Sequence, residues 1–193
     1  MTAVDSAPPS PAVRTLRAPR GLSKLPRLSV VALLISVSAL LVVFDDTFRS
    51  AEAWFAAFWL NPLVARGSQS IGDHYLVWIS PDKLIAFHLT VECTAAVLLI
   101  PLLCIGAMIL LVPKVPVIRG LVGVALGIVV ILITNQLRLG MIAWATIRWG
   151  LDPGYEIFHR FVGSAFAIVG FAVAFVVMLL AMGQRRKSRR VTK

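Results

Sequence analysis

The sequence has few charged residues. They make up 15% of the 193 residues, whereas apolar types together with cysteine make up 59%, and the mean hydropathy is +0.87. A soluble domain of this size needs a larger polar share to cover its surface. The scarcity of charge therefore excludes a soluble fold and indicates a chain that folds in a lipid bilayer.

Cysteine is also scarce. The two cysteines, Cys93 and Cys104, lie eleven positions apart within one apolar stretch. On a continuous helix this separation is about 16 Å, far beyond the Cα distance that a disulfide allows. A disulfide between them is excluded, and each is expected to be a free thiol.

Four apolar segments are candidates for membrane-spanning helices, and together they predict an all-α fold, a polytopic bundle of about four transmembrane helices. The segments cover residues 28–44, 84–112, 120–147 and 158–182. As a single helix the second segment would be about 43 Å long, which exceeds the hydrocarbon thickness. Its first two turns are therefore expected to stand above the hydrocarbon or to run strongly tilted.

An aromatic, amphipathic piece follows the first span. It covers residues 53–64 and carries Trp54, Phe55, Phe58 and Trp59. Because aromatic side chains collect at membrane interfaces, this piece is expected to lie in the interface plane or to re-enter it. The remainder of residues 45–83 is predicted to be a loop on the non-cytoplasmic side.

A cleaved signal peptide is the alternative for the first apolar segment. Ala51-Glu52-Ala53 resembles a small-residue cleavage site. However, the basic arm before the segment is unusually long and the site lies well beyond the apolar run, so a retained span is favoured.

Basic residues are concentrated in three segments that the span count places on one side. Residues 1–27 form a predicted disordered basic arm, residues 183–193 form a basic tail, and Lys114 and Arg119 flank a turn between them. All acidic residues except Asp5 lie elsewhere. By the positive-inside rule both termini are cytoplasmic, in a multi-pass protein of the cytoplasmic membrane whose membrane domain is 28–182. The same placement explains the net charge of +10 without nucleic acid.

Three polar residues share one predicted depth. Cys93 is expected about three turns into the second span from its outer end, Arg138 lies near the outer end of the third span, and His159 opens the fourth. Charged residues in or at the edge of apolar spans are costly and favour a functional interpretation. The three are therefore expected to meet at the extracytoplasmic face.

These three side chains suit nucleophilic acyl transfer. Arg138 or a protonated His159 would stabilise the thiolate of Cys93, and His159 can protonate a leaving amine. Each residue also has an ordinary structural interpretation: a buried cysteine as a small apolar side chain, Arg138 snorkelling to the interface, and His159 as a helix-start residue. Cys104, which has apolar neighbours, is expected to be structural.

The local motifs resemble the exosortase/archaeosortase family of membrane transpeptidases. The resemblance rests on the order, spacing and depth of Val91-Glu92-Cys93-Thr94-Ala95, Asn135-Gln136-Leu137-Arg138 and Phe158-His159, and it covers about residues 70–182. It implies a cysteine peptidase or transpeptidase that cleaves the C-terminal sorting signal of membrane-anchored substrates and transfers the new carboxyl end to an amine, glycan or lipid acceptor. Many members have more spans, so this chain resembles a compact variant.

The resemblance implies catalytic roles for Cys93 as nucleophile, Arg138 as stabilising cation and His159 as the third member. Arg160 is the rival for the third role, but only histidine exchanges a proton near neutral pH. Asn135, one turn before Arg138, is a candidate orienting or oxyanion group. No cofactor or metal is implied.

A metal-binding protein is the main alternative from another class. His88 with Glu92 and Glu156 with His159 have spacings that place a carboxylate and an imidazole on one helix face. However, a His-Glu-x-x-His motif is lacking, and the cytoplasmic half holds almost no polar residue to continue an ion pathway. A non-catalytic membrane assembly factor is the other alternative.

Overall fold

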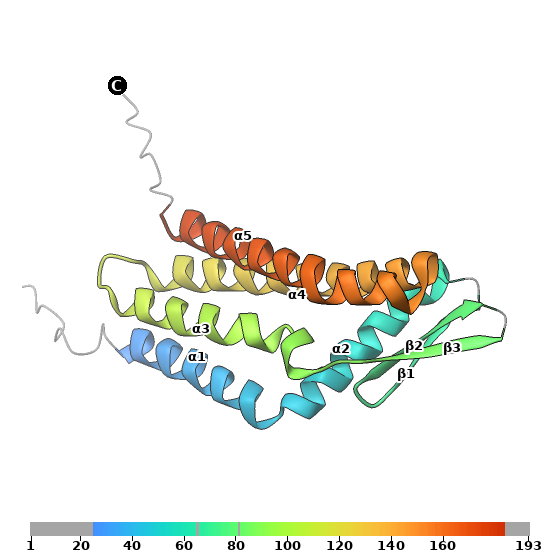
Figure 1. The fold of residues 1–193 in the computed structure, drawn as a ribbon. Helices are drawn as coiled ribbons and strands as arrows, with labels where there is room; N and C mark the ends of the chain where they lie inside the picture. Colours follow the sequence, from blue (N-terminus) through green and yellow to red (C-terminus); the bar gives the residue numbers. More distant parts are fainter. Residues whose placement is uncertain (1–24, 65, 81, 184–193) are drawn as a thin grey trace, which may run out of the picture.

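The computed structural model describes residues 25–64, 66–80 and 82–183, so the predicted arm and tail lie almost entirely outside the described residues. The helices are α1 (Leu25–Val43), α2 (Asp45–Leu60), α3 (Ala96–Leu111), α4 (Val117–Trp149) and α5 (Gly163–Gly183). The strands are β1 (Ser68–Ile71), β2 (His74–Ser80) and β3 (Lys83–His88). Figure 1 shows α1, α3, α4 and α5 side by side, with α2 and the strands toward one end.

Three helical segments are long and apolar enough to cross a membrane. They are Leu25–Val43, Val117–Asp152 and Phe158–Gly183. Helix α3 is apolar but has 16 residues, about 24 Å, which is shorter than the typical hydrocarbon core. The protein is thus a mostly helical membrane protein by these features, and the count of four spans stays a prediction.

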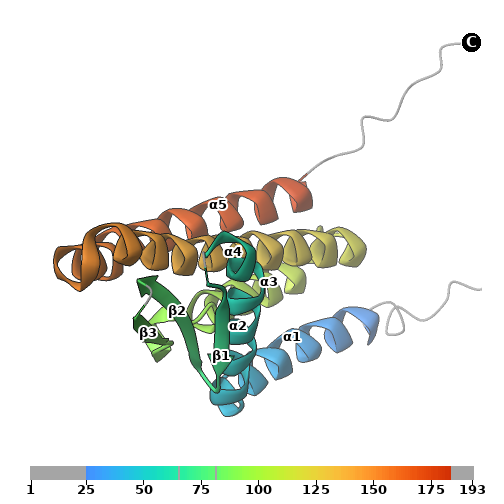
Figure 2. The ribbon, with the colours of Figure 1, turned by 90° about the vertical axis from the view of Figure 1, so that its right-hand side faces the viewer.

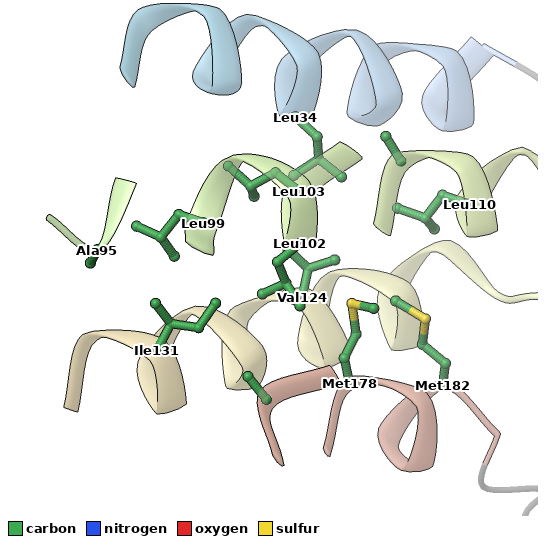
Figure 3. Close-up of a cluster of buried hydrophobic side chains, with 12 residues drawn as sticks. Leu34, Ala95, Leu99, Leu102, Leu103, Leu110, Val124, Ile131, Met178 and Met182 are labelled. Atoms are coloured by element: carbon green, nitrogen blue, oxygen red, sulfur yellow. The ribbon is translucent and has the colours of Figure 1, made fainter. Parts of the chain in front are cut away.

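A hydrophobic core joins the four bundle helices. Figure 3 shows Leu34 of α1, Leu102 and Leu103 of α3, Val124 of α4 and Met178 of α5 directed toward one another. Helices α4 and α5 approach closely at Gly170, where a Cβ would lie 2.2 Å from Thr134 Cγ2. Since most other large side chains of these helices face outward, the core is a narrow seam.

One end of the bundle is tied together by Arg27. Its Nη1 donates to Val112 O at 2.6 Å and its Nη2 donates to Val115 O at 2.8 Å. These carbonyls follow the C-terminus of α3, where a guanidinium compensates unpaired acceptors. The start of α1, the α3–α4 turn and the end of α5 therefore share one end of the molecule (Figure 1).

The small sheet corrects the all-α prediction. Strands β1, β2 and β3 form an antiparallel meander where a loop and the outer part of a span were predicted. The expected helix over 84–112 is wrong before Ala96, because Lys83–His88 is strand β3 and Val91–Cys93 is a 3₁₀ turn. A short apolar run does not by itself distinguish a strand from a helix, and no proline or glycine separates this run from α3 in the sequence.

The sheet packs on α2 and α4 through a second core cluster. Tyr75 and Val77 of β2 are buried on the same face, as period-two alternation requires. They meet a face of small residues on α2 that includes Ala53, Ala56 and Ala57. Figure 2 shows the sheet beside α2 and below α4.

Helix α2 contains the aromatic piece that was predicted to be interfacial. Trp54, Phe55 and Phe58 are exposed on it, which agrees with its amphipathic pattern. A 3₁₀ turn, Asn61–Leu63, ends it before β1. The described residues therefore place a helix and a three-stranded sheet where most of the outer loop was expected.

Candidate active site

Cys93 closes the 3₁₀ turn that precedes α3. Its side chain is buried at 3% relative exposure, and its amide donates to Thr90 O at 2.9 Å. The Thr90 hydroxyl donates to Cys93 Sγ at 3.5 Å. The predicted position of Cys93 three turns inside a span is thus corrected: the thiol lies just outside α3, at its N-terminal end.

Arg138 reaches Cys93 from α4. Its Nη2 lies 3.9 Å from Cys93 Sγ, and its Nη1 donates to Glu92 O at 3.3 Å. The guanidinium is buried, and its Nε has no hydrogen-bond partner among the residues that the structure describes. Arg138 therefore presents a desolvated positive charge to both the thiol and the backbone of its turn.

His159 also approaches Cys93 Sγ. It lies in a π-helical turn, Phe158–Val162, that leads into α5. Its Nδ1 and Nε2 are 3.8 and 3.9 Å from Cys93 Sγ, and its ring stacks on Tyr155 with centroids 4.9 Å apart. The stacking restrains the plane of the imidazole, whose two nitrogens lie at nearly equal distances from the sulfur.

The surroundings of Cys93 act on its thiol in opposite directions. Burial raises the pKa, while the His159 ring, the Thr90 hydroxyl and the Arg138 charge stabilise the thiolate, and the net pKa lies below that of an ordinary cysteine. Cys104, near Ser38 in the helical bundle, is also a free thiol, so the predicted absence of a disulfide is confirmed.

Arg160 and Asn135 do not contact the thiol. Arg160 is exposed and its Nη1 pairs with Glu156 Oε1 at 3.3 Å. Asn135 is buried, and its Nδ2 donates to Glu52 Oε1 at 2.9 Å. The structure thus brings Cys93, Arg138 and His159 together and directs the two further candidates elsewhere.

The carboxylate of Glu52 is the feature that sequence reasoning missed. It accepts hydrogen bonds from Thr94 Oγ1, from Ala95 N at 3.1 and 3.2 Å, and from Asn135 Nδ2. Burial raises its pKa, and these donors offset part of that effect. The network joins α2 and α4 to the two residues that follow Cys93.

A small cavity opens beside the thiol. Its lining includes Cys93 and His159 together with Tyr75, Tyr155 and His88. The Tyr75 hydroxyl donates to Leu139 O at 3.3 Å. Burial raises the pKa of Tyr75, so the phenol keeps its proton.

One of the two spacings predicted for a metal site is wrong. His88 and Glu92 do not share a helix, because His88 ends strand β3 and Glu92 lies in the 3₁₀ turn. Within the described residues one group could hold a metal ion instead, and it consists of Asp73, His74 and His88. This group is separate from the Cys93, Arg138 and His159 cluster.

Comparisons with protein-family models, with curated proteins and with solved structures find no match to this chain. The function is therefore argued from the geometry of the site.

Proposed function

We propose that this protein is a membrane cysteine transpeptidase or protease that acts on membrane-anchored substrates carrying a C-terminal transmembrane sorting signal. One observation supports the proposal above all: Cys93 Sγ lies within 4 Å of both His159 and Arg138. The three residues come from three separate segments of the chain. A thiol, an imidazole and a buried guanidinium are the groups that thiolate-based acyl transfer requires.

The first half-reaction forms a thioester. The thiolate of Cys93 attacks the scissile carbonyl carbon, and the resulting oxyanion is stabilised by the guanidinium of Arg138. The carbon–nitrogen bond breaks as the imidazolium of His159 gives its proton to the leaving nitrogen. The C-terminal part of the substrate departs, and the new carboxyl end stays on Cys93 as a thioester.

The second half-reaction resolves the thioester. An amine or hydroxyl of an acceptor attacks the thioester carbon, His159 takes the acceptor's proton, and the Cys93 thiolate is released. Attack by water in place of the acceptor would make the enzyme a protease. An amine, a glycan hydroxyl and a lipid headgroup all supply the nucleophile that this step needs.

The end of the bundle that holds the site is proposed to face the extracytoplasmic side. The opposite end carries Arg27 and the turn with Lys114 and Arg119, as the positive-inside rule expects of a cytoplasmic end. Exposed Trp54, Trp144 and Trp149 mark the site end, and tryptophan favours the membrane interface. A substrate helix packed in the bilayer would present its scissile peptide at this level.

Paired cysteine variants test the proposal. A secreted protein encoded next to this gene, with a C-terminal helix followed by Arg or Lys, is co-expressed with wild type, Cys93→Ala or Cys104→Ala. We expect cleaved substrate with wild type and Cys104→Ala, and none with Cys93→Ala at equal expression. Mass spectrometry of acid-quenched wild type should find substrate covalently bound to Cys93.

The same experiment separates the alternatives. A metal-centred peptidase cleaves through an activated water and leaves no adduct on Cys93. An assembly factor would keep its effect on the substrate in Cys93→Ala. Cleavage that continues in Cys93→Ala would refute the role of this thiol.

A further inference from the structure

We propose that Asp73, His74 and His88 form a binding site for a divalent transition-metal ion of the Zn²⁺ class, separate from Cys93. Imidazole and carboxylate together suit such ions, and a two-histidine, one-carboxylate set leaves coordination positions open for water. This inference does not depend on the proposed transpeptidase function, because its test measures metal binding.

The two hairpins of the sheet create the site. Asp73 is the second residue of the two-residue loop Gly72-Asp73 between β1 and β2, where Gly72 has φ +58°. His74 opens β2 and is paired in register with His88, the last residue of β3. Leu89 N donates to Asp73 O at 3.0 Å, which fixes the loop against the end of β3. The backbone thus holds all three ligands in place.

The candidate ligand atoms already converge. His74 Nδ1 lies 2.7 Å from Asp73 Oδ1, and His88 Nε2 lies 3.0 Å from Asp73 Oδ2. All three ligand groups offer atoms within 4.8 Å of one another. With metal–ligand bonds of about 2.0–2.2 Å, a tetrahedral ion needs ligand separations of roughly 3.3–3.5 Å. The two histidine–Asp73 pairs would open by roughly half an ångström, and the most distant pair of ligand atoms, up to 4.8 Å apart, would close by up to about 1.3 Å.

The two imidazoles are arranged so that both can bind one ion. Their rings stack with centroids 4.5 Å apart and 17° between planes, and both direct a nitrogen at the same carboxylate. The side chains of His74 and His88 are 42% and 49% exposed, so an ion can enter from solvent. An ion would take the place of the hydrogen bonds that these nitrogens make with Asp73.

Charges around the site favour a cation. Arg49 Nη1 lies 3.3 Å from Asp73 Oδ2, and the same guanidinium pairs with Asp45 at 3.0 Å and with Asp46. Three carboxylates thus face one guanidinium, which leaves a net negative charge. Arg49 Nη1 also donates to Leu89 O at 2.9 Å, and this bond holds the guanidinium in place beside Asp73. The guanidinium thereby orients the Asp73 carboxylate, as a hydrogen bond behind a metal ligand does.

The position of the site suggests its role. His88 lies two residues before Thr90, where the turn that carries Cys93 begins, and His88 also borders the small cavity beside the thiol. An ion held by His88, His74 and Asp73 would join the ends of β2 and β3. It would thereby fix the backbone from which the Cys93 turn departs.

Metal titration of the full chain in detergent tests the site. The protein carries no polyhistidine tag, is treated with a chelator, and is titrated with Zn²⁺ or Co²⁺. We expect one ion per chain and a Tm increase of about 5–10 °C at an ion concentration a hundred times Kd. Absence of stoichiometric binding would overturn the proposal.

Variants locate the bound ion. Asp73→Asn, His74→Gln and His88→Gln should each weaken binding at least tenfold, whereas His159→Gln and Cys93→Ser should bind as wild type does. Circular dichroism checks that each variant is folded, and His88→Gln, which changes the more exposed of the two rings, is the variant least expected to unfold. Unchanged binding in both histidine variants, or a Co²⁺–thiolate absorption band that Cys93→Ser removes, would place the ion elsewhere and refute the site.

Discussion

Replacing Glu52 by alanine should destabilise the protein and disorder the turn that carries Cys93. In the folded chain the Glu52 carboxylate accepts hydrogen bonds from Ala95 N, from Asn135 Nδ2 and from the Thr94 hydroxyl. All of these groups are buried, and Glu52 itself is 5% exposed. Alanine at this position removes the acceptor of these three donors and supplies no other acceptor.

The expected magnitude follows from the donors left without an acceptor. The Thr94 hydroxyl can rotate to another partner, but Ala95 N and Asn135 Nδ2 cannot. A buried donor without a partner costs about 1–3 kcal/mol, so Glu52→Ala should lose roughly 2–6 kcal/mol of folding free energy. For a chain of this length about 2–4 °C of Tm corresponds to each kcal/mol, which predicts a Tm decrease of at least about 4 °C.

Glu52→Gln and Glu156→Ala are the matched comparisons. Glutamine keeps the size of the side chain and one acceptor oxygen, and its NH₂ can donate to the Thr94 hydroxyl, so its loss should be smaller than that of alanine. Glu156 is exposed and pairs only with Arg160 across the surface, which predicts almost no change in Tm.

Thermal unfolding followed by tryptophan fluorescence in detergent measures the effect. Alkylation of Cys93 by iodoacetamide, in a Cys104→Ala background, reports the turn without a substrate. We expect Tm to fall in the order wild type, Glu52→Gln, Glu52→Ala. The alkylation rate of Glu52→Ala should differ from the wild-type rate more than that of Glu52→Gln does. A Glu52→Ala protein that unfolds within about 1 °C of wild type would refute the reasoning from unpaired donors.

Three further predictions concern the candidate site. Because the pKa of Cys93 is lowered, its alkylation rate should reach a plateau at a lower pH than the rate of an ordinary cysteine does, and His159→Ala should raise the midpoint of the pH–rate profile. Identical profiles for wild type and His159→Ala would contradict this. Gly163→Ala places a Cβ 2.9 Å from both Arg138 Nε and the backbone oxygen of Phe158, so it should slow alkylation and lower Tm, and an unchanged rate would show that Arg138 adjusts freely. Tyr155→Ala removes the ring stacked on His159, worth about 0.5–1.5 kcal/mol, and should lower the alkylation rate at neutral pH more than Tyr155→Phe does.

The convergence of Cys93, Arg138 and His159 could be predicted although the helix around Cys93 was wrong. The prediction needed only the rough level of each residue along the bundle. Cys93 was placed inside a helix and in fact lies three positions before α3, but it is at the same end of the bundle as predicted. A guanidinium inside an apolar helix and a histidine at a helix start are costly positions that the sequence displays directly. The three residues therefore meet as predicted, although the secondary structure before Ala96 was predicted wrongly.

The sheet and the Glu52 network could not be predicted in the same way. Residues 84–87 are apolar and no proline or glycine separates them from α3, so the hydrophobic pattern does not distinguish strand from helix there. The partners of Glu52 are 42 to 83 positions away along the chain, and only the packing of α2 against α4 brings them together. One signal was present: Glu52 shares an i, i+4, i+8 face with Ala56 and Leu60, both buried.

The π-helical turn Phe158–Val162 lets the direction of the His159 ring be set separately from the packing of α5 in the bundle. In a continuous α-helix one rotation about the helix axis would set both. In this turn Gly163 N bonds Phe158 O, one residue further than in an α-helix. The extra residue rotates everything before it by about 100° relative to the packing face of α5. Substitutions on the packing face of α5 therefore need not change the direction of the His159 imidazole. Deletion of one residue from this turn should move the ring away from Cys93 Sγ while the bundle still assembles.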